Sequence, residues 1–142
     1  MKIRKATSED ILEVLEVWKS SGLSIRPKGR DKPDSLVEQL TQPNLWIIVA
    51  EEESVIVGVV LVTHDTRKGW INRLAVRSTK MKQGIATKLL KAAEESLYNI
   101  GIEVIALLIS EDNLPSRLFF EKENYQYQKE ITYYSKRISP DS

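Results

Sequence analysis

The order of the expected elements indicates an α+β domain, with a mixed, mostly antiparallel central sheet and helices on both of its faces. Three observations point to this class. Runs of β-branched and alternating residues mark several strands, and apolar residues at helical spacing mark four helices. One long helix lies between two strand patterns, which is typical of a β-α-β crossover. With 142 residues, the chain fits a single domain at residues 1–138, and residues 139–142 are expected to form a disordered tail.

The N-terminal third contains one strand and two helices. The strand is predicted at Lys2–Ala6, and Thr7 is the expected N-cap of the first helix. The buried face of that helix consists of Ile11, Val14, Leu15 and Trp18, at i, i+3, i+4 and i+7. Gly22 ends it, and a polar loop at 25–34 leads to a short second helix around Leu36–Leu40.

The middle of the chain changes to strand patterns. Leu45–Ala50 and Val55–His64 are β-branched runs separated by an acidic turn, which predicts a hairpin. A fourth strand is predicted at Trp70–Val76. An amphipathic helix follows at Gly84–Ile100, with Gly101 as its C-terminal stop.

The C-terminal third begins with a nearly continuous apolar run at Val104–Ile109, the pattern of a strand that is buried on both faces. Asn113 is the expected N-cap of a final short helix. Two closing strands are predicted at Tyr125–Ile131 and Thr132–Ile138.

Composition excludes several classes of function. The chain has no cysteine and one histidine, His64, so a thiolate nucleophile and a cysteine metal site are excluded, and no metal is expected. The longest apolar run, Val55–Val62, is too short to cross a bilayer, and the charged N-terminus is unlike a signal segment. We therefore expect a cytoplasmic protein without a membrane partner.

The charge distribution is uneven although the net charge is only +1. Between Thr66 and Ala93 there is no carboxylate, whereas the remainder of the chain has an excess of acidic residues. This basic segment contains Arg67, Lys68, Arg73, Arg77, Lys80, Lys82, Lys88 and Lys91. Within it, the small-residue turn at 83–86 opens a helix, and unpaired helix N-terminal amides favour anions. The segment therefore predicts a site for a phosphate-bearing ligand.

Two motifs resemble those of the GNAT N-acetyltransferase superfamily. The stretch Met81-Lys82-Gln83-Gly84-Ile85-Ala86, which follows strand 70–76, is similar to the acyl-CoA-binding motif Arg/Gln-x-x-Gly-x-Gly/Ala. The stretch from Asn113 to Tyr125 resembles the second motif, Asn-x-x-Ala-x-x-Leu/Phe-Tyr-x-Lys-x-Gly-Phe. With the element order, the resemblance covers nearly the whole chain. It implies the acyl-CoA N-acyltransferase fold and acetyl-CoA as the cofactor.

The resemblance also implies roles for individual residues. Backbone amides of the loop and helix start would hold the CoA pyrophosphate, and the strand Trp70–Val76 would pair with the pantetheine arm. The cofactor-binding residues implied are Leu74, Ala75, Val76, Met81, Lys82, Gln83, Gly84, Ile85, Ala86, Thr87, Asn113, Ser116, Phe119, Phe120 and Lys122.

Three positions depart from the family pattern. Met81 stands where Arg or Gln is usual, and Asn124 replaces a glycine, which asparagine can do because it tolerates positive φ. Phe120 stands at the position of the tyrosine that protonates the departing thiolate, so the general acid is unknown. The phenols of the closing strands could substitute, although packing is the more typical role of Tyr125, Tyr127, Tyr133 and Tyr134.

The sequence also leaves the identity of the general base open. Where many family members place a carboxylate, this chain has Asn72, which could only orient a water molecule. Glu51, His64 and Asp65 are the other candidates for the base.

The acceptor side is expected to include Arg26, Trp70 and Tyr133, whereas core packing is the better interpretation of Trp18. Arg26 and Arg67 could pair with a carboxylate on the acceptor. The predicted function is direct transfer of an acetyl group from acetyl-CoA to a primary amine of a small molecule, peptide or protein, in a ternary complex.

Two alternatives remain. One is a CoA-binding sensor with little or no turnover, for which Phe120 and Asn72 are the evidence. The other is a nucleic-acid-binding domain, which the low net charge disfavours, so no nucleic acid partner is expected. A sheet edge among the closing strands would permit a homodimer.

Overall fold

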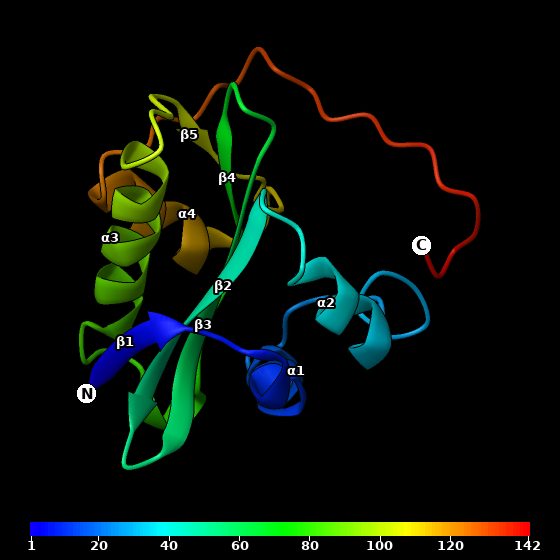
Figure 1. Ribbon diagram of the computed structural model, residues 1–142. Coiled ribbons are helices and arrows are strands. Elements are labelled where there is room, and N and C mark those ends of the chain that lie inside the picture. Colours follow the sequence, from blue (N-terminus) through cyan, green and yellow to red (C-terminus); the bar gives the residue numbers. More distant parts are fainter.

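A five-stranded sheet runs through the centre of the computed structural model, which describes residues 1–142, and helices lie on both sides of it (Figure 1). The strands are β1 (Lys2–Lys5), β2 (Leu45–Glu52), β3 (Val55–His64), β4 (Gly69–Val76) and β5 (Ile105–Ala106), in the spatial order β1-β2-β3-β4-β5. The first four strands are antiparallel neighbours, and β5 is parallel to β4. The predicted α+β class and the β-α-β crossover are confirmed.

The helices divide into two layers. Helix α1 (Ile11–Ser20) and helix α2 (Pro33–Gln39) lie on one side of the sheet, whereas α3 (Ile85–Tyr98) and α4 (Leu114–Lys122) lie on the other (Figure 1). Two short 3₁₀ turns, η1 (Ser8–Asp10) and η2 (Ser78–Lys80), precede α1 and the loop before α3. Thr7, predicted as the N-cap of the first helix, instead caps η1, and its amide hydrogen is accepted by the Asp10 carboxylate as in a capping box.

Each layer has its own hydrophobic core, because alternate residues of the strands face opposite sides. Under α3, the core includes Val60, Val62, Ile71, Leu89 and Leu97. Under α1, it includes Val14, Trp18, Ile47, Val49 and Val59. Trp18 is fully buried in this second core, which confirms its interpretation as a core residue.

Two glycines set how closely α3 approaches the sheet. A Cβ on Gly58 of β3 would lie 2.7 Å from Leu89 Cδ1, and one on Gly69 of β4 would lie 2.5 Å from Leu97 Cδ1. Both leucines are fully buried, so neither side chain has free space to move into. The helix is therefore fixed against the sheet near both of its ends.

The predicted strand Val104–Ile109 is wrong in length and in burial. Only Ile105 and Ala106 pair with β4, and Val104 and Leu108 are 50% and 63% exposed. Because β5 is the edge of the sheet, only Ile105, Leu107 and Ile109 pack on the core under α3. One face of the segment is covered and the other is open, which its apolar composition did not reveal.

The two closing strands predicted at Tyr125–Ile131 and Thr132–Ile138 are absent. The chain instead extends from α4 across the top of the molecule toward α2, as Figure 1 shows. Strand-like side chains do not form a strand without a neighbour, and no backbone hydrogen bond joins this segment to β5. At its end, the Asp141 carbonyl oxygen contacts Gly29, in the loop between α1 and α2.

Candidate functional site

The N-terminus of α3 and the loop before it expose a row of unpaired amides. The amides from Lys82 to Thr87 donate no hydrogen bond within the protein, and the first turn of α3 has no acidic residue. Lys82 and Gly84 have φ values of +65° and +79°, so the loop turns twice through the left-handed region immediately before the helix. A Cβ built on Gly84 meets no atom within 4 Å, which leaves the backbone accessible. Unpaired amides at a helix start favour the binding of an anion.

The side chains around these amides carry less positive charge than the sequence predicts. Three cations of the basic segment are in ion pairs: Arg73 with Asp31, Arg77 with Glu13 and Lys80 with Glu52. Two exposed lysines near the helix start, Lys82 and Lys88, have no acidic partner. The Thr87 hydroxyl, expected to face the anion, donates to Glu123 at 3.1 Å. Attraction of an anion therefore depends mainly on the backbone amides and these two lysines.

The strand before this loop has a free edge. β4 pairs with β5 only at Gly69 and Trp70, so the edge of β4 from Ile71 to Val76 that faces β5 has no strand beside it. Leu74, Ala75 and Val76, the strand residues assigned to the cofactor, lie in this part. An extended ligand could add here as a further strand.

A bulge in the middle of β4 coincides with the free edge. Arg73 has a φ of +51°, and the pairing with β3 shifts register between Val59 and Leu61. The Trp18 indole on α1 donates to the Arg73 carbonyl oxygen at 2.9 Å. A non-glycine residue in this conformation costs about 1 kcal/mol or more, so the indole bond and the Asp31 ion pair are the contacts that hold it.

The second motif contributes the helix behind this edge. The Asn113 side chain caps α4 by accepting the Ser116 amide hydrogen at 3.3 Å, so it has a structural bond of its own. Phe120 is buried, and its ring packs edge-to-face on Phe119 and on Tyr125. The Lys122 side chain is exposed. At the other motif, Met81 is 59% exposed and supports no part of the loop by packing.

The residues assigned to the acceptor are only partly brought together. The Asn72 amide nitrogen lies 3.1 Å from the Thr63 hydroxyl and 3.3 Å from the Trp70 carbonyl oxygen, so only its own oxygen is free to orient water. The Arg26 backbone amide donates to Asp31. Tyr133 belongs to the extended C-terminal segment and is 63% exposed.

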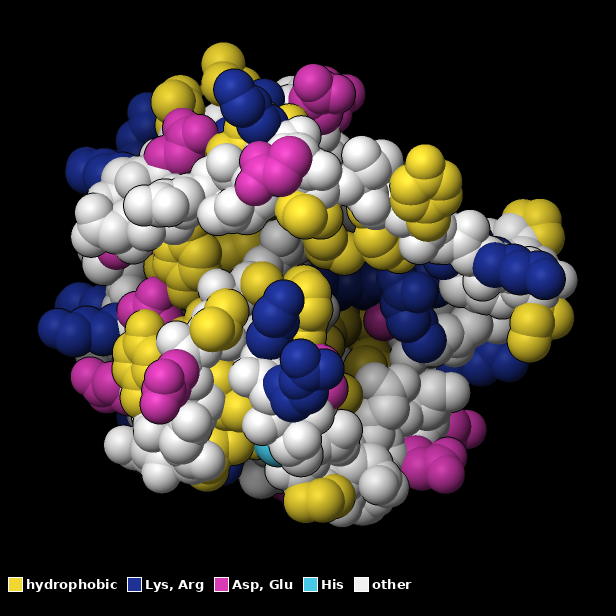
Figure 2. All heavy atoms as spheres, turned by 90° about the horizontal axis from the view of Figure 1, so that it is seen from above, with side chains coloured by type: hydrophobic (Ala, Val, Ile, Leu, Met, Phe, Trp, Pro, Cys, Tyr) yellow, Lys and Arg dark blue, Asp and Glu magenta, His cyan; other side chains and the backbone are white.

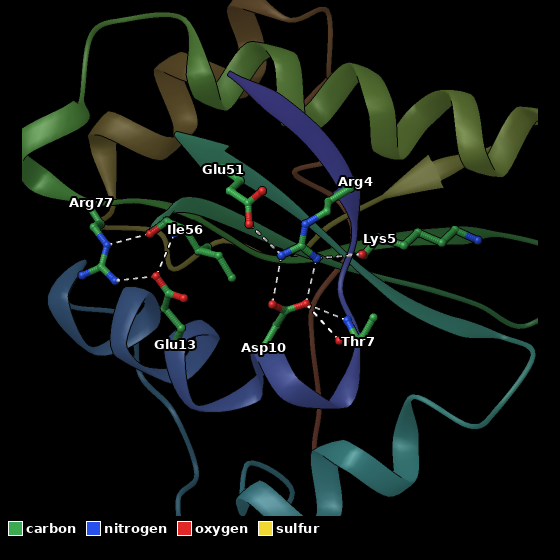
Figure 3. Close-up of polar contacts among 8 residues, drawn as sticks. All are labelled: Arg4, Lys5, Thr7, Asp10, Glu13, Glu51, Ile56 and Arg77. Atoms are coloured by element: carbon green, nitrogen blue, oxygen red, sulfur yellow. Dashed lines mark hydrogen bonds and ion pairs between the residues drawn. The ribbon is translucent and has the colours of Figure 1, made fainter. Parts of the chain in front are cut away.

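The carboxylate candidates for the base are occupied by other contacts. Glu51 accepts from Arg4, which also binds Asp10 through both of its terminal nitrogens, and Figure 3 shows the three side chains converging between β1, β2 and η1. Asp65 lies in the exposed turn before β4, where backbone hydrogen bonds from Lys68 and Arg67 lower its pKa. A lowered pKa makes a carboxylate a weaker base.

The imidazole and phenol candidates are likewise engaged. His64 accepts the Thr66 amide hydrogen through Nδ1, and its ring lies 5.8 Å from that of Trp46. The Tyr125 hydroxyl donates to Glu94 on α3 at 2.7 Å. Burial and this carboxylate raise the pKa of Tyr125 above its ordinary value, so it is a poor proton donor.

The ion pair between Arg77 and Glu13 belongs to a network that includes the backbone of Ile56. Arg77 donates through Nε to the Ile56 carbonyl oxygen, and Glu13 accepts the Ile56 amide hydrogen (Figure 3). This network joins α1 to the start of β3. It assigns Arg77 to the fold rather than to the anion site.

One cluster has almost no signal in the sequence. Arg73, Asp31 and Trp18 meet on the α1 side of the β4 bulge, and Asp31 is the one buried charged residue of the chain. The only signal is Arg73, a charged residue inside the predicted strand Trp70–Val76. The partner, Asp31, comes from a loop that shows no pattern.

No cluster of acidic or histidine side chains could hold a metal ion. None of the helices combines the length and the hydrophobicity needed to cross a membrane.

A family model and a relative in sequence both relate this chain to acetyltransferases. The family model described as the acetyltransferase (GNAT) family matches residues 11–125. An acetyltransferase of Sodalis glossinidius is 28% identical over 141 residues, which is 99% of this chain and 98% of that protein.

Among solved structures, the PaiA N-acetyltransferase of Thermoplasma acidophilum in complex with coenzyme A superimposes with a TM-score of 0.78 at 20% identity, over 86% of this chain and 87% of that one. AAC(6')-Iy in complex with a bisubstrate analogue, CoA-S-monomethyl-acetylneamine, gives a TM-score of 0.81 at 17% identity, over 96% and 97% of the two chains. At these identities, the two superpositions show that the chain shares the fold of these proteins.

Proposed function

The chain belongs to the GNAT acetyltransferase family, and we propose that it moves an acetyl group from acetyl-CoA directly to a primary amine within a ternary complex. The observation that carries the proposal is the row of six unpaired amides from Lys82 to Thr87 beside the accessible backbone of Gly84. Such a row matches the oxygens of a pyrophosphate, which is the most highly charged part of CoA. Lys82 and Lys88 would add charge at its rim.

The remainder of the cofactor would follow the free edge of β4. Ile71 to Val76 lie on the path from the α3 N-terminus toward the point where β4 and β5 separate. Backbone groups of Leu74 and Val76 would pair with the amides of the pantetheine arm, as an added strand does. The acetyl carbonyl would then lie next to the bulge at Arg73.

Bound acetyl-CoA supplies an activated thioester. The amine nitrogen forms a bond to the acetyl carbon, the carbon–sulfur bond breaks, and CoA leaves as a thiolate. A thiol with a pKa near 8.5 leaves tolerably well without an acid. The reaction can therefore proceed although the buried Phe120 has no proton to donate. Before the attack, the ammonium would pass one proton to a water molecule that the free oxygen of Asn72 orients. The second proton, which the nitrogen loses as the amide forms, would pass through water to the CoA thiolate.

A matched pair of variants tests the cofactor site. Gly84 and Gly101 lie at the two ends of α3 with similar φ values of +79° and +88°, and a Cβ at either position would meet no atom within 4 Å. Asparagine tolerates this backbone conformation better than other residues, whereas valine would strain it. Gly84→Asn and Gly101→Asn should therefore cost similar stability, but only Gly84→Asn places a side chain among the unpaired amides.

Calorimetric titration with acetyl-CoA, with ATP as the comparison, gives the readout. We expect micromolar binding by the native protein and by Gly101→Asn, much weaker binding of ATP, and at least tenfold weaker acetyl-CoA binding by Gly84→Asn. Equal affinities of the two variants would remove the amide row as the cofactor site.

One observation supports the alternative of a CoA-binding sensor. The candidate bases Glu51, Asp65 and His64 and the candidate acid Tyr125 all have other hydrogen-bonding partners. Steady-state release of the CoA thiol in the presence of amines separates the two functions. Micromolar binding without thiol release across a broad panel of amines would favour the sensor.

A further inference from the structure

The cluster on the α1 side of β4 centres on a buried ion pair. Nη1 of Arg73 lies 2.6 Å from Oδ2 of Asp31, and the Arg26 amide donates to the same oxygen. Asp31 is 4% exposed, and the Arg73 side chain is 14% exposed. The pair thus joins the loop between α1 and α2 to the strand whose free edge would hold the acetyl group.

The Arg73 guanidinium is fixed but not saturated. Its carbon lies 5.3 Å from the centre of the Trp18 ring, which holds the plane of the group. An arginine has five N–H donors, and only Nη1 faces Asp31. Nε and Nη2 donate no hydrogen bond within the protein. Of the three nitrogens only Nη1, which faces Asp31, is fully buried. These two nitrogens therefore keep access to a ligand.

The loop that covers the cluster is strongly cationic. Between Arg26 and Lys32 there are four basic residues and one carboxylate, Asp31, which is buried and already paired. Seen from above, the molecule has a hollow that contains Lys or Arg side chains and is bordered by hydrophobic ones (Figure 2). The field over this side of β4 therefore attracts anions and repels a polycation.

We propose that Arg73 is a specificity-determining residue, whose Nε and Nη2 donate to a carboxylate of the acceptor. The acceptor would then be an amine that carries a carboxylate, such as an amino acid or a short peptide. This inference rests on the proposed acetyl transfer and names the class of acceptor. Arginine suits the role because its planar fork matches two carboxylate oxygens at once.

The proposal adds Arg73 to the arginines that the sequence offers for the acceptor side. The sequence offers Arg26 and Arg67 for pairing with a carboxylate, but Arg67 lies in the exposed turn between β3 and β4. Asn72 pairs with Leu61 and Ala75 with Val59, and the register shifts between these two pairs, so Arg73 lies at the bulge itself. Although AAC(6')-Iy has the same fold, its bound analogue derives from neamine, and a polyamine of that kind would meet the cations of this loop.

Matched acceptors provide the test. Amino acids and dipeptides are compared with their C-terminal amides, at saturating acetyl-CoA, by thiol release and by calorimetric binding to the complex of protein and CoA. We expect kcat/KM to be about 10- to 100-fold higher for the carboxylates, the range that a charge-assisted hydrogen-bonded pair supplies. The difference should lie in KM rather than kcat, because the contact is remote from the reacting atoms.

Variants assign the preference to Arg73. Removing Arg73 alone would leave Asp31 buried and unpaired, so the main variant is the double change Arg73→Gln with Asp31→Asn. It should lose the preference for carboxylates, so that the ratio of kcat/KM for each acid to kcat/KM for its amide falls to about one. Using this ratio cancels any loss of rate that acid and amide share because the bulge has lost the Asp31 ion pair. Arg73→Lys, which retains the charge without the fork, should keep part of the preference. Arg67→Gln is the control and should keep all of it.

The outcomes separate this inference from the proposed function. If the native protein fails to bind acetyl-CoA, the proposed function and the inference both fall. If it binds acetyl-CoA but neither binds nor acetylates carboxylates better than their amides, or prefers a polyamine, only the inference is overturned. A preference that survives the double variant would likewise overturn it, whatever the result with Arg67→Gln.

Discussion

Replacing Gly58 by alanine tests whether the position of α3 on the sheet sets the affinity for the cofactor. The added Cβ would lie 2.7 Å from Leu89 Cδ1 and 3.0 Å from Ile85 Cγ2, in the first two turns of the helix. Carbon atoms in contact are normally about 3.5–4.0 Å apart. Something must therefore shift by several tenths of an ångström or more. Because Leu89 and Ile85 are buried among other side chains, we expect the start of α3 to move away from β3.

The expected cost has two opposing parts. Overpacking a core position costs about 1–3 kcal/mol, whereas alanine in a strand is about 0.5–1 kcal/mol better than glycine. The free energy of unfolding should therefore fall by about 0.5–2 kcal/mol. The same movement misplaces the amides of residues 85–87, and each hydrogen bond to a charged group contributes about 1.5–3 kcal/mol. Partial loss of one such bond predicts roughly tenfold weaker binding of CoA.

Gly69→Ala is the matched control at the other end of α3. Its Cβ would lie 2.5 Å from Leu97 Cδ1 and 2.9 Å from Cδ2, so a similar loss of stability is expected. Leu97 is three turns from the unpaired amides, and CoA affinity should change little. Urea unfolding measures the stability of both variants, and calorimetric titration with CoA measures their affinity. Equal affinities despite similar destabilisation would refute the idea that the closeness of the helix start to the sheet controls binding.

Three further variants test the acid–base contacts. Hydrogen bonds from Arg4 hold the pKa of Asp10 below its ordinary value, so its stabilising contribution is complete above about pH 4 and is lost as the pH falls through the lowered pKa. Asp10→Asn should lower stability at pH 7 and flatten its decline in acid, as followed by thermal unfolding; an unchanged acid decline would contradict this. Tyr125→Phe removes the bond to Glu94 and should cost about 1–2 kcal/mol without changing kcat, whereas a large fall in kcat would make the phenol the general acid. Phe120→Tyr places a hydroxyl in an apolar cluster and should lower stability by about 1 kcal/mol with no gain in rate; faster thiol release would show that leaving-group protonation is limiting.

The sheet, the α3 crossover and the unpaired amide row could all be predicted because their signals are local. The β-branched runs of β2 and β3 and the helical period of α3 each lie within one segment of the chain. Gly84 and Gly101 bracket α3 as its composition indicates. In each case the sequence signal and the resulting structure involve neighbouring residues.

The failures concern contacts between distant segments. The apolar run around Ile105 indicated burial, but whether a strand is an edge depends on what lies beside it, and here nothing does. The strand pattern of Tyr125–Ile138 likewise gives no information about a neighbour. The positive charge of the segment from Thr66 to Ala93 is lower than its composition indicates because Glu13, Asp31 and Glu52, outside that segment, neutralise three of its cations.

The placement of the three tryptophans makes intrinsic fluorescence informative in this protein. Trp18 donates its indole hydrogen at the Arg73 bulge, and Trp70 stands where β4 and β5 separate. Trp46, on β2, donates to Ser96 on α3 and so reports on the packing of that helix against the sheet. Variants that retain one indole each would thus give separate emission signals for the acceptor side, the strand opening and the remainder of the fold. Stopped-flow mixing could then establish which ligand enters first.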